Sequence, residues 1–336
     1  MPVAETIRNA IEKSSMIRRM FEEGLELKQK FGADRVYDFT IGNPDLNPPE
    51  KFYETVVSLA ADRSPGVHGY MPNAGYPDVR RKVAAFASRQ QETECTADNI
   101  VMTVGAAGAL NVILRTLLNP GDEVIVPRPY FAEYGAYVSN HNGVLIGVPS
   151  TEDFSLSIPD IEDAITPSTK VILINTPNNP TGRVYSREIL EKLGALLNRM
   201  KQQGQTMYLV SDEPYRDVVY DGVEVPPLLP IYTETFVVTS FSKTLSLPGE
   251  RIGYIVQHPA MEGADEVMNG LVMCNRTLGF VNAPALMQRT VAELLEEQVA
   301  VDVYARRRKI FTDGLDAAGL SYAPPEGAFY LFVKAP

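Results

Sequence analysis

Seven short apolar segments, rich in β-branched residues and separated by turn-forming residues, dominate the chain after residue 99. They span 100–104, 123–127, 143–149, 170–175, 207–211, 235–240 and 251–257. Several are apolar almost throughout, as expected of strands that are covered on both faces. Helical spacing is found between some of them, at 106–118, 186–203 and 258–272. Alternation of strands and helices predicts an α/β fold, here a three-layer sandwich with a mostly parallel seven-stranded sheet.

The regions before and after these segments predict a second, smaller α+β domain. Helices are expected at 6–31 and near 50–62, then at about 284–298 and 299–318, and a final strand, GAFYLFV, at 327–333. A chain of 336 residues is long enough for one large domain and one smaller one. We therefore predict an N-terminal helix and arm over 1–50 that belongs to the small domain, a large domain over 51–281, and a small C-terminal domain over 282–336.

Charge and composition narrow the class of partner. The chain has 31 Lys and Arg against 42 Asp and Glu, a net charge of −11. Such a chain repels phosphate backbones and anionic lipids, so we expect neither a nucleic acid nor a membrane as partner. The two cysteines, Cys95 and Cys274, lack metal-ligand spacing, and the N-terminus lacks the apolar core of a signal peptide. We expect a cytoplasmic protein without a metal site.

Ligands of open α/β sheets bind beyond the carboxyl ends of the strands, and four of the expected strand ends carry unusual residues. The segments that follow these strands are GAAGAL (105–110), NTPNNPTG (175–182), SDEPYRDVVYDG (211–222) and SFSKTLSLPGERIGY (240–254). In the first, Gly105 permits a tight turn that leaves the amides of Ala106 and Ala107 open to an anion. A plain strand–helix turn is the alternative.

The other three segments carry side chains with possible chemical roles. Lys243 lies between a buried strand and Arg251, a cationic setting that lowers the pKa of a lysine and favours Schiff-base chemistry; a solvated loop lysine is the alternative. Asp212 ends a buried strand and requires a partner, such as a pyridinium nitrogen, with the phenol of Tyr215 nearby; a helix-capping role is the alternative. Asn179 could hydrogen-bond a ring hydroxyl or simply form an Asn-Pro turn.

The order of these segments resembles the fold-type I pyridoxal-phosphate enzymes, specifically the class I/II aminotransferase family, from about residue 35 to the end. NNPTG, SDEPY and SFSK…PGERIGY are specific motifs of that family, and GAAGAL is a weaker one. The resemblance implies that Lys243 forms the internal aldimine with pyridoxal 5'-phosphate and then acts as general acid and base. It implies that Asp212 pairs with the pyridinium nitrogen, which lets the ring act as an electron sink.

The resemblance implies further contacts to the cofactor and the substrate. Asn179 and Tyr215 would bind the phenolic oxygen of the ring, and Phe131, in RPYFAEY, would stack on its face. The phosphate would be held by Gly105, the amides of Ala106 and Ala107, Ser240, Ser242 and Arg251. Tyr70, in GYMPNAGY, matches a tyrosine that reaches the phosphate from a neighbouring subunit, which implies a homodimer. Gly42, in FTIGNPD, matches a glycine beside the substrate carboxylate, and Asn179 would also contact the substrate.

The expected function is an amino-acid:2-oxo-acid aminotransferase with a ping-pong mechanism. A carbon–sulfur β-lyase on the same scaffold shares every motif quoted above, and an inactive cofactor-binding protein is a third alternative. The family binds the α-carboxylate with an arginine beyond GAFY, whereas here no arginine follows Arg308. We expect either a truncated chain or another group in its place. Arg276 lies near the position where some relatives bind a dicarboxylate side chain, although a surface helix arginine is the favoured interpretation.

Overall fold

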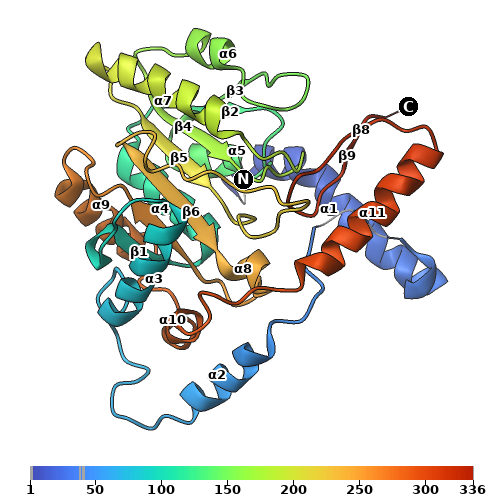
Figure 1. Cartoon of the computed structure of the whole chain (residues 1–336), viewed down its shortest axis with the longest axis horizontal. Coiled ribbons are helices and arrows are strands. Elements are labelled where there is room, and N and C mark those ends of the chain that lie inside the picture. Colours follow the sequence, from blue (N-terminus) through green and yellow to red (C-terminus); the bar gives the residue numbers. More distant parts are fainter. Residues whose placement is uncertain (1–2, 38, 40–41, 336) are drawn as a thin grey trace. The chain divides into compact units, whose positions relative to one another are not determined.

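The computed structural model describes residues 3–37, 39 and 42–335, in two compact units, Met1–Asn43 and Pro44–Pro336. The first unit contains helix α1 (Glu5–Phe31) and a short 3₁₀ turn at Ala33–Arg35. Helix α1 confirms the helix that the sequence predicts at 6–31. All other elements belong to the second unit (Figure 1).

The second unit is built on the predicted seven-stranded sheet. Its strands are β1 (Ile100–Thr103), β2 (Glu123–Pro127), β3 (Val144–Val148), β4 (Thr169–Asn175), β5 (Tyr208–Asp212), β6 (Thr235–Ser240) and β7 (Gly253–Gln257). Their order across the sheet is β1-β7-β6-β5-β4-β2-β3. Only β7 runs against its neighbours, pairing antiparallel with both β1 and β6. The mostly parallel α/β sheet is therefore confirmed.

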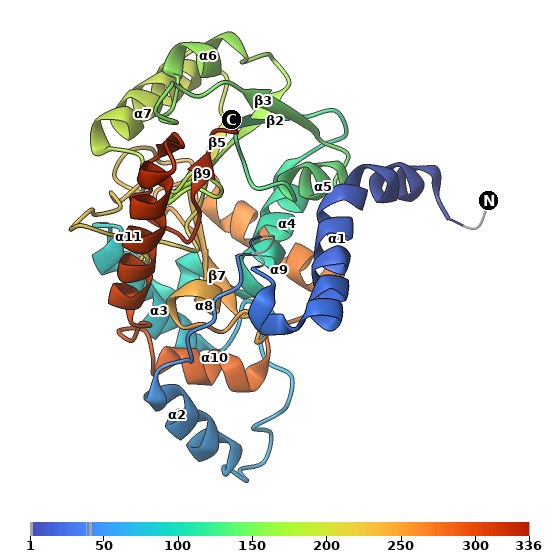
Figure 2. The same cartoon turned by 90° about the vertical axis from the view of Figure 1, so that its right-hand side faces the viewer.

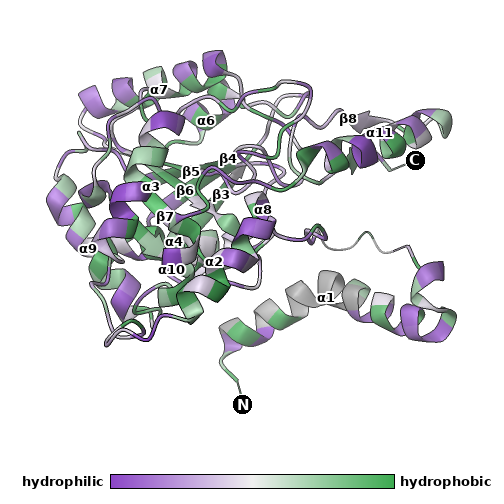
Figure 3. Ribbon diagram, turned by 60° about the horizontal axis from the view of Figure 1, so that its bottom comes forward, coloured by the Kyte–Doolittle hydropathy of each residue, from purple (hydrophilic) through white to green (hydrophobic). Residues whose placement is uncertain are grey.

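Successive side chains of the central strands enter two different cores, one on each face of the sheet. Ile172 and Ile174 of β4 belong to one apolar cluster, whereas Val171 and Leu173 belong to the other. Side chains of a strand alternate between the two faces, so a strand covered on both must be apolar at nearly every position. Figure 3 shows this hydrophobic interior in green along β4 to β7.

Helices cover both faces of the sheet and complete the three layers. They are α2 (Glu50–Ala60), α3 (Pro77–Gln90), α4 (Gly105–Leu117), α5 (Tyr134–Ser139), α6 (Ile158–Asp163), α7 (Arg187–Gln202), α8 (Phe241–Thr244), α9 (Ala264–Thr277), α10 (Ala285–Ala292) and α11 (Val301–Ala317). Buried residues of α3, α6, α7 and α10 join one core, and those of α4, α5 and α9 join the other. Figure 2 shows α6 and α7 side by side over the β2–β3 end of the sheet. None of the helices among the described residues is long and apolar enough to cross a bilayer.

Two helices, α9 and α10, differ in their bounds from the sequence prediction, and α3, α5, α6 and α8 were not predicted. Helix α9 begins at Ala264 rather than 258, because Pro259 and the left-handed Gly263 form a turn before it. Helix α10 ends at Ala292 rather than 298, where Leu294 turns into the core. The longest unpredicted helix, α3, starts with Pro77 at its first position, a favourable helix start that follows a turn-rich stretch.

The predicted strand at 327–333 is mostly a turn. Only Phe332–Val333 (β9) is extended, and it pairs with Tyr322–Ala323 (β8). Residues 326–328 instead hydrogen-bond to two loops of the large sheet: the amides of Glu326 and Gly327 donate to Gly182 O, and that of Ala328 donates to Val218 O. The GAFY turn, residues 327–330, is thereby attached beside the loops that follow β4 and β5.

Candidate active site

Most of the predicted site residues lie at one end of the sheet, just beyond the last residues of β1, β4, β5 and β6. Register explains the convergence: Asn175 pairs with Asp212, and Ser240 pairs with Gly253. Because β7 is antiparallel, its first residue lies at the same edge as the last residues of its neighbours. Arg251, just before β7, therefore comes close to segments that follow other strands.

Asp212, the carboxylate predicted for the site, is buried, with 5% of its surface exposed. The hydroxyl of Tyr134 donates a 2.6 Å hydrogen bond to its Oδ2. Its Oδ1 is buried and has no partner among the described residues. Burial raises the pKa of Asp212 to about 7, the nearby Glu213 adds to the rise, and the Tyr134 hydrogen bond opposes it. A buried carboxyl with one unsatisfied oxygen favours a cationic partner at Oδ1.

Asn175 fixes the loop of Asn179 to the strand that carries Asp212. Its Nδ2 donates to the backbone oxygen of Asp212 over 2.7 Å, and its Oδ1 accepts the amide of Asn179 over 2.6 Å. The sequence alone did not predict a role for Asn175, although Asn175 is the first residue of the NTPNNPTG segment.

Lys243 lies in the short helix α8, one turn past the end of β6. Its Nζ is 5.7 Å from the ring centroids of both Tyr215 and Phe329. Burial and, to a smaller extent, the positive charge of Arg251 lower the pKa of Lys243 to about 8. An amine with this pKa is partly neutral near physiological pH and is therefore available as a nucleophile and base.

Tyr215 is buried opposite the lysine and hydrogen-bonds a residue that sequence analysis missed. Its hydroxyl lies 2.9 Å from the hydroxyl of Tyr330, and Asn179 Nδ2 donates to the same Tyr330 oxygen over 3.3 Å. Burial is the main cause that raises the pKa of both phenols, so both remain protonated at neutral pH. Tyr330 belongs to the GAFY motif, which was the available signal, and Tyr134 belongs to RPYFAEY.

The predicted phosphate site combines a close backbone approach with a cation. Gly105 opens α4 with φ +69°, and a Cβ added there would lie 2.7 Å from Nη2 of Arg251. A Cβ on Gly253 would lie 2.4 Å from the oxygen of Thr239. The guanidinium therefore faces the first turn of α4, where Ala106 and Ala107 lie. Ser240 and Ser242 are buried at the start of α8.

The remaining predicted residues have looser connections to this cluster. Phe131 packs edge-on against Tyr134, with ring centroids 5.5 Å apart. Tyr70 is 96% exposed. Arg276 is exposed at the end of α9, in agreement with the surface interpretation. Gly42 belongs to the first compact unit and not to the unit that contains the other site residues.

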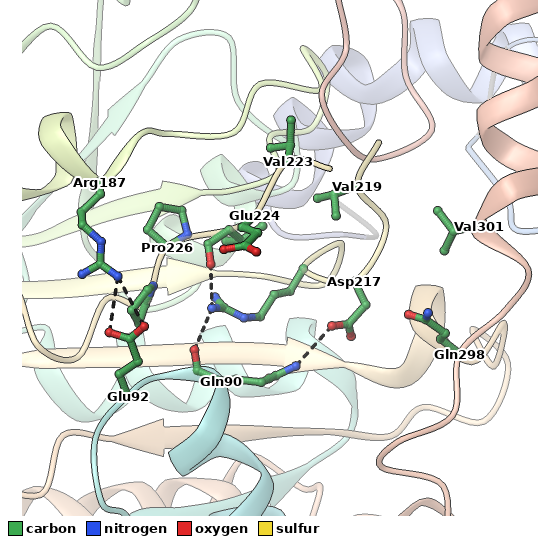
Figure 4. A pocket seen from close by; sticks show the side chains of 13 residues that line it. Gln90, Glu92, Arg187, Asp217, Val219, Val223, Glu224, Pro226, Gln298 and Val301 are labelled. Carbon is green, nitrogen blue, oxygen red and sulfur yellow. Dashed lines mark hydrogen bonds and ion pairs between the residues drawn. The ribbon is translucent and has the colours of Figure 1, made fainter. Parts of the chain in front are cut away.

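A cleft of about 700 Å³ lies away from these residues and has none of them in its lining (Figure 4). Its polar groups are largely paired with one another. Arg187 forms an ion pair with Glu92, and Gln90 Nε2 donates to Asp217. Size alone therefore does not indicate the reactive site.

Comparison with known proteins shows the family of the chain. The family described as "Aminotransferase class I and II" matches residues 34–336. The aspartate/prephenate aminotransferase of Thermus thermophilus is 33% identical over 322 residues, covering 93% of this chain and 79% of that protein. Aromatic-amino-acid aminotransferase 2 of Thermococcus litoralis is 32% identical over 331 residues, covering 95% and 80%. A crystal structure of an aminotransferase from Eubacterium rectale superposes with a TM-score of 0.95 at 37% identity, covering 100% and 85%.

Proposed function

The chain belongs to the class I and II aminotransferases, a family of pyridoxal-phosphate enzymes, and on this basis we propose that it transfers amino groups between amino acids and 2-oxo acids in two alternating half-reactions centred on Lys243. The observation that carries the proposal is that two neighbouring strands, β5 and β6, end beside a buried carboxyl with one unsatisfied oxygen and a lysine of lowered pKa. The two groups require opposite partners, an electrophilic carbon and a cation, and a pyridine aldehyde offers both.

The residues present fit pyridoxal phosphate at three points. Oδ1 of Asp212 is buried without a partner and would accept from a protonated ring nitrogen. The space beside Gly105, which a Cβ would fill, faces the guanidinium of Arg251 and suits a phosphate. Asn179 and Tyr215 offer hydrogen-bond donors for the phenolic oxygen. Phe131 is proposed to cover one face of the ring.

The bound cofactor supplies an electron sink that makes the α-proton of the amino acid acidic. The residues of this chain do the rest. Lys243 Nζ would hold the cofactor covalently and would move the α-proton of the substrate as general base and acid. Oδ1 of Asp212 would accept the hydrogen of a protonated ring nitrogen. Arg251, Ser240, Ser242 and the amides of Ala106 and Ala107 would hold the phosphate.

We further propose a homodimer with shared active sites. The support is Tyr70, a tyrosine that is 96% exposed in a single chain although its motif matches a phosphate-binding position of the family. The two relatives named above act, by name, on aspartate and prephenate and on aromatic amino acids. We propose an α-amino acid as donor and Gly42 and Asn179 as contacts to it, without narrowing the side chain.

Reduction with borohydride tests the covalent role of Lys243. The protein loaded with pyridoxal phosphate should retain one cofactor per chain after reduction and denaturation, on the peptide that contains Lys243. Lys243→Ala should retain none, whereas Lys192→Ala, which removes an exposed lysine paired with the exposed Glu188, should retain it. A reduced adduct on another lysine would contradict the proposal.

Mixing the loaded protein with single amino acids separates the candidate reactions. An aminotransferase bleaches the visible cofactor band, releases the 2-oxo acid once per site, and recovers only when a 2-oxo acid is added. A β-lyase would instead release pyruvate and ammonia from cystathionine continuously and without an acceptor. A protein that only binds the cofactor would show no change of the band with any amino acid.

A further inference from the structure

Tyr330 connects Tyr215 and Asn179, the two side chains that we propose as donors to the phenolic oxygen of the cofactor. Its hydroxyl lies 2.9 Å from that of Tyr215 and accepts from Asn179 Nδ2 over 3.3 Å. The three side chains come from three separate segments: the loop after β4, the loop after β5, and the turn beyond α11. Their convergence makes one continuous hydrogen-bonded chain.

Either phenol can donate in the bond between Tyr215 and Tyr330, and one of the two orders leaves hydrogens for an outside acceptor. Asn179 Nδ2 carries two hydrogens and each phenol carries one. Asn179 uses one hydrogen on Tyr330, so the Tyr330 hydroxyl can donate its own to Tyr215. That order leaves the Tyr215 hydrogen and the second Asn179 hydrogen for an outside acceptor. Hydrogen bonds in series polarise one another, so donation from Tyr330 makes Tyr215 a stronger donor.

The position of Tyr330 is fixed by the turn that carries it. The amide of Ala328 donates to Val218 O, and the hydroxyl of Tyr220 donates to Ala328 O over 2.6 Å. The ring of Tyr330 also packs edge-on against that of Tyr215, with centroids 5.8 Å apart. The hydroxyl is therefore held in place by its own backbone and ring, independently of the bond that it makes.

We propose that Tyr330 is a positioning residue of the active site: acting through Tyr215 and Asn179, it orients and strengthens the two donors that hold the phenolic oxygen in its ionised form. The inference rests on the proposed function. The turn beyond α11 would then help to set the charge state of the cofactor, in addition to lining the site.

The test is the pH at which the bound cofactor changes its absorbance, measured without substrate in the loaded protein. Losing Tyr330 weakens donation to the ionised oxygen, so the midpoint in Tyr330→Phe should rise by about half a pH unit to one unit, roughly a three- to tenfold change in proton affinity. Asp212 and Lys243, two other titratable groups that act on or lie near Tyr215, are the same in both proteins.

Two comparisons separate this role from a structural one. Tyr220→Phe removes a hydroxyl that helps to hold the same turn but touches neither donor. Its midpoint should rise by less than half as much as that of Tyr330→Phe, because the amide of Ala328 still holds the turn. In a Tyr215→Phe background, adding Tyr330→Phe should shift the midpoint by less than half as much as it does in the wild type, because Tyr330 acts largely through Tyr215.

An unmoved or lowered midpoint in Tyr330→Phe, or a rise at least half as large in Tyr220→Phe, would overturn the inference while leaving the aminotransferase proposal intact. A full shift in the Tyr215→Phe background would overturn it as well. A wild-type protein that forms no reducible adduct would instead contradict the proposed function itself.

Discussion

The hydroxyl of Tyr134 lies 2.6 Å from Oδ2 of Asp212, in a position where Tyr134 has no exposed surface. This bond directs the carboxyl group and leaves Oδ1 as its unsatisfied oxygen. Tyr134→Phe removes a donor to a charged group, a loss of about 1.5–3 kcal/mol. We expect the affinity for pyridoxal phosphate to fall by about ten- to a hundredfold, measured by fluorescence titration of the cofactor-free protein. An affinity equal to that of the wild type would show that Asp212 is held by its backbone alone.

Asp212 should make the stability of the cofactor-free protein fall as the pH rises from about 4 to about 7. Its pKa in the folded protein is raised to about 7, so its contribution to stability is complete below the unfolded value near 4 and is lost as the pH rises through 7. Asp212→Asn removes that loss, which amounts to roughly 4 kcal/mol above pH 8. The variant should unfold at a higher temperature than the wild type at pH 8 and at a similar one at pH 4. Thermal unfolding across this range provides the measurement.

Lys243 should react as a partly neutral amine. Its pKa of about 8, compared with about 10.4 for an ordinary lysine, raises its neutral fraction at pH 7 by roughly two orders of magnitude. The rate at which the cofactor-free protein forms a reducible adduct with pyridoxal phosphate should reach half its maximum near pH 8. Arg251→Gln removes a positive charge that lowers this pKa, so the half-maximum should move to higher pH. A profile centred above pH 10 in the wild type would contradict the assignment.

Gly105 should be required for the anion site more than for the fold. A Cβ there meets the mobile end of Arg251, which can move aside, so Gly105→Ala displaces the guanidinium. Gly121→Ala is the matched control, because Gly121 also has positive φ but has open space around its Cβ position. Both variants should lose about 1–2 kcal/mol of stability from backbone strain. Only Gly105→Ala should also bind pyridoxal phosphate at least tenfold more weakly, whereas equal affinities would contradict the site.

Mixing two inactive variants tests the shared active site. Tyr70→Ala and Lys243→Ala should each have little activity alone. If Tyr70 completes the site of the neighbouring subunit, a mixed dimer carries both substitutions in one site and leaves the other intact. Subunit exchange at equal concentrations should then recover about a quarter of the wild-type activity. No recovery, with mixed dimers present in native mass spectra, would show that Tyr70 does not complete the site of the neighbouring subunit.

The sheet was predictable because each of its strands carries its own signal. A strand that enters two cores must be apolar at nearly every position, and the run KVILIN shows that requirement directly. The boundaries of α10 and of the 327–333 segment depend on distant contacts. Ala328 bonds to Val218, far away in the sequence, and no local pattern records such a partner. The β propensity of GAFYLFV was therefore overridden by tertiary hydrogen bonds.

The site was predictable in its motifs and not in the bonds between them. Asp212 and Lys243 are found from their places at strand ends. Tyr134 and Tyr330, by contrast, lie in quoted motifs, yet only the folded chain brings their hydroxyls to Asp212 and Tyr215. A tyrosine among apolar residues has the same pattern whether its hydroxyl is used or not. Side chains that act through others leave a weaker signal than those that need burial of a charge.

The antiparallel strand β7 has a consequence for how this site can change. Ser240 and Gly253 are paired in the sheet, so the connection between them is a closed loop with both ends fixed. Lys243 lies near its entrance and Arg251 near its exit. Insertions in the middle of this loop can alter the surroundings of the arginine without moving the amine or the register of the sheet. Anion binding at Arg251 can therefore change while the position of the Lys243 amine stays the same.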